Sequence, residues 1–269
     1  MRFLKNKHNM IITVIFIIII LVLSISVFIL SNDRYKDFKK GIYVRKQVGQ
    51  IVIIDEGFID FTFYSVKKEN YDFLLWDITF ETDDNIQLNG NDHEISVSSE
   101  NELIDKIILT IQTTENIQLN GKYLSNLIFS KDNETIKLSI GHILIHTISS
   151  ENYISGIMSV AYNAILINDN YTMEFTNISD YPILFQKVSI NDQEFLSNHE
   201  LLPGEVAQFE YSLTDLVNEY PNFDIVLNPL INFDFDETSY TNTNPTNSYF
   251  NYLKNESELM EFIKEANPI

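Results

Sequence analysis

The sequence predicts an all-β protein: an N-terminal transmembrane helix followed by one or two β-sandwich domains and a short C-terminal helix. Three observations lead to this prediction. An uncharged apolar run of twenty residues stands near the N-terminus, short segments of alternating apolar and polar residues follow, and the last apolar residues recur at helical spacing. Hydrophobic residues make up 45% of the chain, which is enough to fill one or two cores.

Residues 11–30 are the predicted transmembrane helix, because they are Ile, Leu, Val and Phe interrupted only by one Thr and two Ser. At about 1.5 Å per residue, such a helix covers roughly 30 Å, the thickness of a bilayer's hydrocarbon core. A cleaved signal peptide is the alternative, since Ser24-Ile25-Ser26 resembles a cleavage site. That site would cut inside an apolar run that is already longer than a typical signal. We therefore expect a single-pass anchor in the cell membrane.

The basic residues on the two sides of this run favour opposite orientations. Residues 1–10, the predicted cytoplasmic tail, carry three basic residues and no acidic one, whereas residues 31–48 form a basic juxtamembrane collar with six basic residues. Long domains cross membranes with little regard to their charge. We therefore expect a cytoplasmic N-terminus and an extracytoplasmic C-terminal domain, with the collar lying against anionic headgroups.

The charge balance restricts the partners. The chain has 38 acidic and 18 basic residues, a net charge of −20, and only nine of the basic residues follow Lys46. Such a field repels nucleic acid and attracts cations or basic proteins, so we expect no nucleic-acid partner. The absence of cysteine excludes thiol catalysis and cysteine-ligated zinc.

Residues 49–150 are the first predicted β-rich domain, with strands at 50–55, 58–66, 71–82 and 135–149. Ile59, Phe61 and Phe63 alternate with polar residues and share one face, which predicts a core position for all three. Trp76, the only tryptophan, is interpreted as a core residue, with a ligand platform as the alternative.

One internal repeat occurs in this domain. Residues 78–90 read ITFETDDNIQLNG, and residues 109–121 read LTIQTTENIQLNG. Asn-Gly is the preferred centre of a type I′ hairpin turn, because both residues tolerate positive φ. Each copy is therefore predicted to be a strand that enters a hairpin, with return strands at 93–98 and 122–129. A repeated acidic binding loop is the alternative.

His142 and His146 are four residues apart in a stretch rich in Ile and Thr, which predicts a strand. On a strand the two imidazoles share a face about 13 Å apart. That distance is too long for both to bind one metal ion.

Residues 151–238 are the second predicted domain, after the polar break at 149–152. Strands are expected at 157–168, 171–176, 183–190, 206–213 and 223–235. Two turn signals separate them: residues 176–182 (TNISDYP), and residues 202–205 (LPGE), where Pro and Gly occupy the positions that a type II turn requires.

Together, the stretches MEFTNISDYPILFQKVSIND and LLPGEVAQFEYSL resemble bacterial extracytoplasmic immunoglobulin-like sandwich domains. The resemblance covers about 40 residues and concerns the fold alone. It implies a spacer, adhesion or assembly module and brings no functional residue.

Residues 239–269 are predicted to be a polar linker, at 239–248, and a C-terminal amphipathic helix, at 255–266. Asn255 is the expected N-cap, and Leu259, Phe262, Ile263 and Ala266 form one apolar stripe. We expect the stripe to dock on the sandwich; insertion into another protein's groove is the alternative.

Few residues point to chemistry. Asp234 and Asp236 project from one face of a predicted strand and Glu237 follows, which makes these three the candidate ligands for a weak Ca²⁺ site. The common nucleotide-binding, hydrolase and metalloprotease motifs are absent from the sequence. We therefore expect no enzyme activity and no other cofactor.

These observations predict a membrane-anchored, extracytoplasmic, non-enzymatic β-sandwich protein. The expected role is a structural or interaction component of a bacterial cell-envelope assembly, with another envelope protein as its partner. The alternative is a surface sensor or binding protein for Ca²⁺ or a basic peptide. Both follow from the anchor and from the acidic domain behind it.

Overall fold

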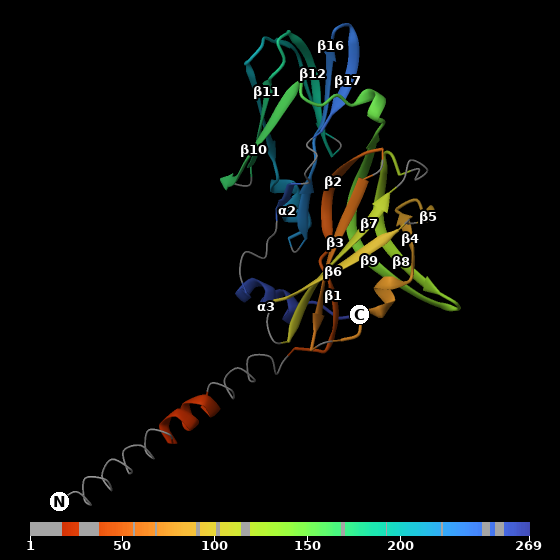
Figure 1. The fold of residues 1–269 in the computed structure, drawn as a ribbon, viewed down its shortest axis with the longest axis vertical. Helices are drawn as coiled ribbons and strands as arrows, with labels where there is room; N and C mark the ends of the chain where they lie inside the picture. Colours follow the sequence, from red (N-terminus) through yellow and green to blue (C-terminus); the bar gives the residue numbers. More distant parts are fainter. Residues whose placement is uncertain are drawn as a thin grey trace, which may run out of the picture.

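The computed structural model describes residues 18–26 and 38–269, except for gaps at 56, 68, 90–91, 101–102, 114–118, 168–169, 192, 222, 244–247 and 251–255. It is a mainly β protein with several sheets and few short helices, which confirms the predicted class at that level (Figure 1). The described strands pair into four sheets.

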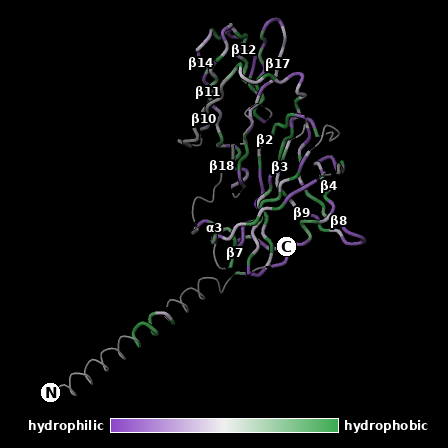
Figure 2. The backbone as a smooth tube through the Cα atoms, in the orientation of Figure 1, coloured by the Kyte–Doolittle hydropathy of each residue, from purple (hydrophilic) through white to green (hydrophobic). Residues whose placement is uncertain are grey.

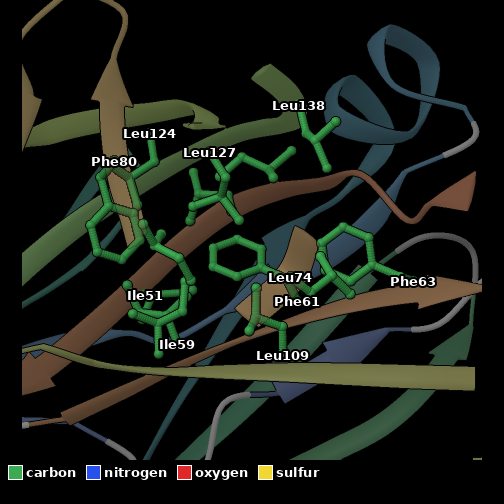
Figure 3. Packing of buried hydrophobic residues seen from close by; sticks show 14 of the residues in the cluster. Ile51, Ile59, Phe61, Phe63, Leu74, Phe80, Leu109, Leu124, Leu127 and Leu138 are labelled. Atoms are coloured by element: carbon green, nitrogen blue, oxygen red, sulfur yellow. The ribbon is translucent and has the colours of Figure 1, made fainter. Parts of the chain in front are cut away.

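Two of these sheets enclose the first core. The smaller has the order β1 (Gly41–Val44), β3 (Gly57–Val66), β7 (Ile104–Thr113), β6 (His93–Ser99). The larger has seven strands, in the order β18 (Ser248–Phe250), β15 (Asp224–Leu227), β2 (Gln47–Ile54), β9 (Glu134–Ile148), β8 (Lys122–Lys131), β4 (Asp77–Thr82), β5 (Gln87–Asn89). Ile59, Phe61 and Phe63 are fully buried, as their alternation predicts, and they lie among side chains of the larger sheet (Figure 3).

The other two sheets enclose the second core. Their orders are β10 (Met158–Ile167), β11 (Asn170–Asn177), β14 (Val206–Ser212), and β13 (Gln193–Leu201), β12 (Ile183–Ile190), β16 (Leu230–Phe235), β17 (Thr238–Asn242). All described pairs in these two sheets are antiparallel. Rings of Phe175, Phe185 and Phe209 lie 5.2–5.5 Å apart at the centre. Aromatic packing thus joins both sheets of this half.

Strands β2 and β15 belong to both cores. β15, β2 and β9 run parallel in a sheet whose other pairs are antiparallel. Ile51 and Val226 pack in the first core, whereas Val48 and Ile225 pack in the second. Burial on both faces is typical of parallel strands inside a fold. The predicted boundary after residue 150 therefore separates strands that pair with each other in the structure.

The short helices are η1 (Asp72–Leu75), η2 (Ser150–Asn152), α2 (Thr214–Glu219) and α3 (Glu256–Glu265). Leu259 and Ile263 of α3 are buried against Phe38, Tyr43 and Tyr64, so the prediction that the apolar stripe docks on the protein itself is confirmed. The predicted cap, Asn255, lies outside the described residues. α3 lies beside the region where the chain enters the first pair of sheets (Figure 1).

The predicted transmembrane run is only partly covered by the structure. Residues 18–26 are helical and mostly hydrophobic (Figure 2). Their large apolar side chains are 50–59% exposed, and the rest of 11–30 lies outside the described residues. No helix within the described ranges has both the length and the apolarity needed to cross a membrane. The cytoplasmic tail, residues 1–10, also lies outside those ranges.

Part of the predicted basic collar is folded into the protein. Residues 41–44 are β1, β2 begins at Gln47, and Arg45 is 1% exposed. Lys40 forms an ion pair with Glu69 at 3.2 Å. The prediction that Arg45 faces lipid headgroups is therefore wrong, because its guanidinium is enclosed by protein.

The two Asn-Gly repeats do not form the predicted hairpins. β6 pairs with β7 and β8 pairs with β4 and β9, so each predicted return strand lies in a different sheet from the repeat that precedes it. Gly121 has a left-handed φ of +70°, but Asn120 lacks the positive φ that a type I′ turn requires at both central residues. The glycine thus marks a turn at the predicted place, and burial of the two strand faces decides the partner.

Three other segments differ from prediction. Residues 72–75 form a 3₁₀ helix in place of the start of a strand, and 223–235 divides into β15 and β16 in different sheets. The predicted linker, 239–248, contains most of β17 and the start of β18. Its Ser, Thr and Asn residues on β17 pair with β16, whose apolar side chains lie in the second core.

Burial makes Tyr64 sensitive to alkaline pH. Desolvation is the main cause that raises the pKa of Tyr64 to about 12, with Arg45 opposing the rise. An unfolded tyrosine ionises near pH 10, so this contribution to stability is present below pH 10 and is lost as the pH rises to about 12. Across that window we expect the raised pKa of Tyr64 to lower the free energy of unfolding by about 1.4 kcal/mol per pH unit.

Denaturant unfolding at several pH values from 9 to 11.5 checks this prediction. Because other tyrosines ionise as well, the measurement is the difference between the wild type and Tyr64→Phe. The variant should lose stability less steeply. If stability fell equally steeply with pH in both proteins, the pKa of Tyr64 would be the same in the folded and the unfolded chain, and burial would not raise it.

Candidate functional site

A cleft of about 790 Å³ is lined by α3 on one side and by β9 of the seven-stranded sheet on another. Four segments distant in sequence line it: residues 44–46 at the end of β1 and in the link to β2, residues 137–139 of β9, Pro221 with Phe223, and one side of α3 with the residues after it. Its walls therefore exist only in the folded chain. It is the candidate functional site.

A buried ion pair fixes the base of the cleft. Arg45 Nε donates to Asp224 Oδ2 at 3.2 Å, Nη2 contacts Oδ1, and the two residues are 1% and 6% exposed. The Arg45 guanidinium carbon also lies 4.8 Å from the centre of the Phe262 ring. The pair joins the link between β1 and β2 to the first residue of β15, and the ring contact joins it to α3. The cleft's walls are thus held in one arrangement.

Two lysines also line the cleft, Lys46 from the link between β1 and β2 and Lys137 from β9. Lys46 Nζ lies 5.6 Å from the centre of the Phe223 ring, a cation–π distance. Lys137 contacts the buried carboxylate of Glu81, which also accepts from Asn126 Nδ2 at 2.8 Å. Arg45 and Lys137 are therefore neutralised by Asp224 and Glu81.

Three glutamates line the opposite side. Glu258, Glu261 and Glu265 are spaced three and four residues apart, so they follow one face of α3, next to the apolar stripe that docks the helix. Glu261 and Glu265 are exposed, and Glu258 is partly buried. Together with Asp224 and Glu81, which pair with two of the cleft's three cations, the acidic side chains at the cleft outnumber the basic ones. The arrangement of carboxylates above apolar and aromatic side chains suits a cationic ligand with an apolar portion.

A stack of aromatic rings continues from the cleft. The Phe223 ring lies 5.1 Å from Tyr220, Tyr220 lies 6.3 Å from His142, and His142 lies 4.1 Å from Tyr123. His142 Nδ1 is 2.9 Å from Asp83 Oδ2. Burial raises the pKa of Tyr220, and Glu219 adds to the rise. The stack holds the segment after α2, which carries Pro221 and Phe223, against β8 and β9.

The two histidines occupy the strand positions that the sequence predicts. His142 packs in the stack, and β9 confirms that both histidines are on a strand. Acidic residues of the first Asn-Gly repeat are likewise engaged within the protein, since Asp83 contacts His142 and Asp84 pairs with Lys122 at 2.9 Å. Trp76 packs against the first core, as predicted.

The calcium prediction concerns the far half of the molecule. Asp234 lies on β16, where its Oδ2 accepts from Gln186 Nε2 at 2.7 Å and its Oδ1 accepts from Ser239. Asp236 and Glu237 form the turn to β17 with positive φ values of 48° and 62°. Nowhere in the described part of the chain do three His, Asp or Glu side chains come close enough to hold a metal ion. The Ca²⁺ site stays a sequence prediction.

Comparison of the sequence with protein-family models gives no match, and comparison with curated proteins gives none either. The evidence for the site is therefore its geometry. Sequence reasoning missed the cleft because its residues are far apart in the chain; Arg45 and Asp224, for example, are 179 positions apart. The one local signal was the glutamate spacing beside the apolar stripe of α3.

Proposed function

We propose that the protein is a membrane-anchored, extracytoplasmic and non-enzymatic component of a bacterial cell-envelope assembly. In this proposal the cleft binds a basic peptide segment of another envelope protein. The observation that carries it is that Glu261 and Glu265, both exposed on α3, line the same cleft as apolar, aromatic and already paired basic side chains. A lysine or arginine side chain satisfies both the carboxylates and the rings.

The proposed anchor rests on the sequence of residues 11–30. A tether there fits the position of the cleft, because β1, which precedes the Arg45 wall, begins at Gly41. The cleft would then lie near the membrane surface. A partner whose basic segment emerges from the same membrane would reach it without crossing the length of the molecule.

The immunoglobulin-like assignment of the second half is part of this proposal. Leaving out β15, the seven strands of this half are, in chain order, β10, β11, β12, β13, β14, β16 and β17. The first, second and fifth of them form one sheet, and the other sheet has the order fourth, third, sixth, seventh. This is the immunoglobulin order with the fourth strand moved to the second sheet. The order supports the resemblance noted above and a role in assembly.

Binding of a labelled peptide to the full-length protein in detergent tests the function. The probe is a fluorescent hexapeptide of alternating arginine and tryptophan, with a glutamate–tryptophan peptide of equal length as its counterpart. We expect binding of the basic probe alone. The double variant Glu261→Lys and Glu265→Lys should weaken it by at least about tenfold, equivalent to about 1.4 kcal/mol.

The matched control is Glu151→Lys with Glu210→Lys, which changes the net charge equally at two exposed positions outside the cleft. It should leave the affinity within about twofold, and added salt should weaken binding to the wild type. If both double variants lost affinity equally, the peptide would be responding to the net charge of the protein alone, and the cleft would not be its binding site.

A further inference from the structure

The apical loops, residues 177–182 and 202–206, expose large apolar side chains in a fixed arrangement. Ile178, Tyr181, Leu202 and Val206 are 49–65% exposed. They lie where β11 leads into β12 and where β13 leads into β14. Exposed apolar side chains gathered on adjacent loops are typical of an interaction surface.

Asn177 ties these loops together. It is fully buried, and its side-chain Nδ2 donates to the carbonyl oxygens of Tyr181 and Leu201, both at 2.8 Å. Its backbone N–H donates to Glu205, and its own carbonyl accepts from Gly204 at 2.8 Å. One buried amide thus fixes both loops, so their positions do not depend on a partner.

Proline restricts two of the exposed residues further. Tyr181 precedes Pro182 and Leu202 precedes Pro203, and a residue before proline is confined to extended conformations. Gly204 has a φ of +81°, and Glu205 N donates to Leu202 O at 2.9 Å, so residues 202–205 form the type II turn that the sequence predicts. Little conformational entropy is left to lose on binding, which favours a preformed docking surface.

The charged residues of this end select the partner. Asp180 and Glu205 lie on the apical loops, and Asp236 and Glu237 form the nearby turn after β16, while the loops contain no basic residue. Leu184, next to the first loop, pairs with Asp234 at the end of β16, which places that turn beside the loops. A second copy would present the same acidic rim, so charge repulsion disfavours self-association. A protein with an apolar centre and a basic rim fits.

We propose that the apical loops dock a second protein, one with an apolar patch bordered by lysine or arginine. In Figure 1 the turn between β16 and β17 is at the top, at the opposite end from residues 18–26. The surface is therefore separate from the cleft beside α3. One molecule could hold a basic segment near its N-terminal end and a second protein at its far end.

Photo-crosslinking in cells that naturally produce the full-length protein tests this inference. The photoreactive residue p-benzoylphenylalanine replaces Tyr181 or Leu202 in turn. The controls place it at Leu75 or Leu196, which are 63% and 72% exposed and lie outside the apical loops. We expect one adduct with another protein from the two apical positions, at least about fivefold stronger than from the controls.

Charge reversal decides whether the adduct reports the proposed surface. Asp180→Lys with Glu237→Lys should reduce the adduct at least about fivefold while the thermal unfolding temperature stays unchanged. Glu261→Lys with Glu265→Lys should leave it intact, so a failed cleft proposal would not remove it. An adduct of the chain with itself, an adduct with lipid, a yield equal to the controls, or insensitivity to charge reversal would each overturn the inference.

Discussion

Replacing Arg45 by methionine is expected to lower the free energy of unfolding by about 3–5 kcal/mol. Asp224 is 6% exposed, and its carboxylate contacts both Nε and Nη2 of Arg45. Without the guanidinium, the charged carboxylate of Asp224 stays buried, where it has neither a counter-charge nor enough water to solvate it. The loss would reach the cleft too, because Arg45 also packs over Phe262 of α3.

The variant Asp224→Asn should be destabilised in the same way, since it leaves the arginine without its counter-charge. Denaturant unfolding of the single variants and of Arg45→Met with Asp224→Leu measures the effect. Because buried ion pairs can often be replaced by apolar residues at little cost, the double variant should recover most of the loss. A cost below about 1 kcal/mol for either single variant would contradict the buried pair.

Replacing Gly141 by alanine is expected to lower the free energy of unfolding by more than about 4 kcal/mol and to leave little soluble protein. Gly141 has a φ of +124°, and a methyl group on it would lie 1.8 Å from the carbonyl oxygen of Gln47 on β2. The neighbouring atom is backbone in a parallel ladder, so no side chain can move to make room.

Gly121→Ala is the matched control, because its φ is also positive, at +70°, but no atom lies within 4 Å of the added carbon. It should lower the free energy of unfolding only by the strain of a left-handed alanine, about 1–2 kcal/mol. The yield of soluble protein and the unfolding temperature of both variants check the comparison. If Gly141→Ala were no worse than Gly121→Ala, β2 and β9 could not approach as closely as the structure has them.

Both predictions concern contacts between segments that are far apart in the chain, and such contacts also decide how the halves are joined. Asp224 and Val226 lie between β14 and β16 of the second set of strands in sequence, yet their strand, β15, pairs with β2 of the first set. Val226 is buried in the first core and Ile225 in the second. A turn signal at residues 149–152 marks a break in the sequence, but it does not report that the chain returns to the earlier sheet.

The sequence by itself determined the mainly β class, the burial of Ile59, Phe61 and Phe63, the type II turn at residues 202–205, and the docking face of α3. These features depend on residue spacing and turn chemistry within about a dozen positions. The tertiary structure alone decided the strand partners after each Asn-Gly, the place of β15 and the cleft. Those depend on which surfaces bury each other, because residues far apart in the chain must meet before such an interaction exists.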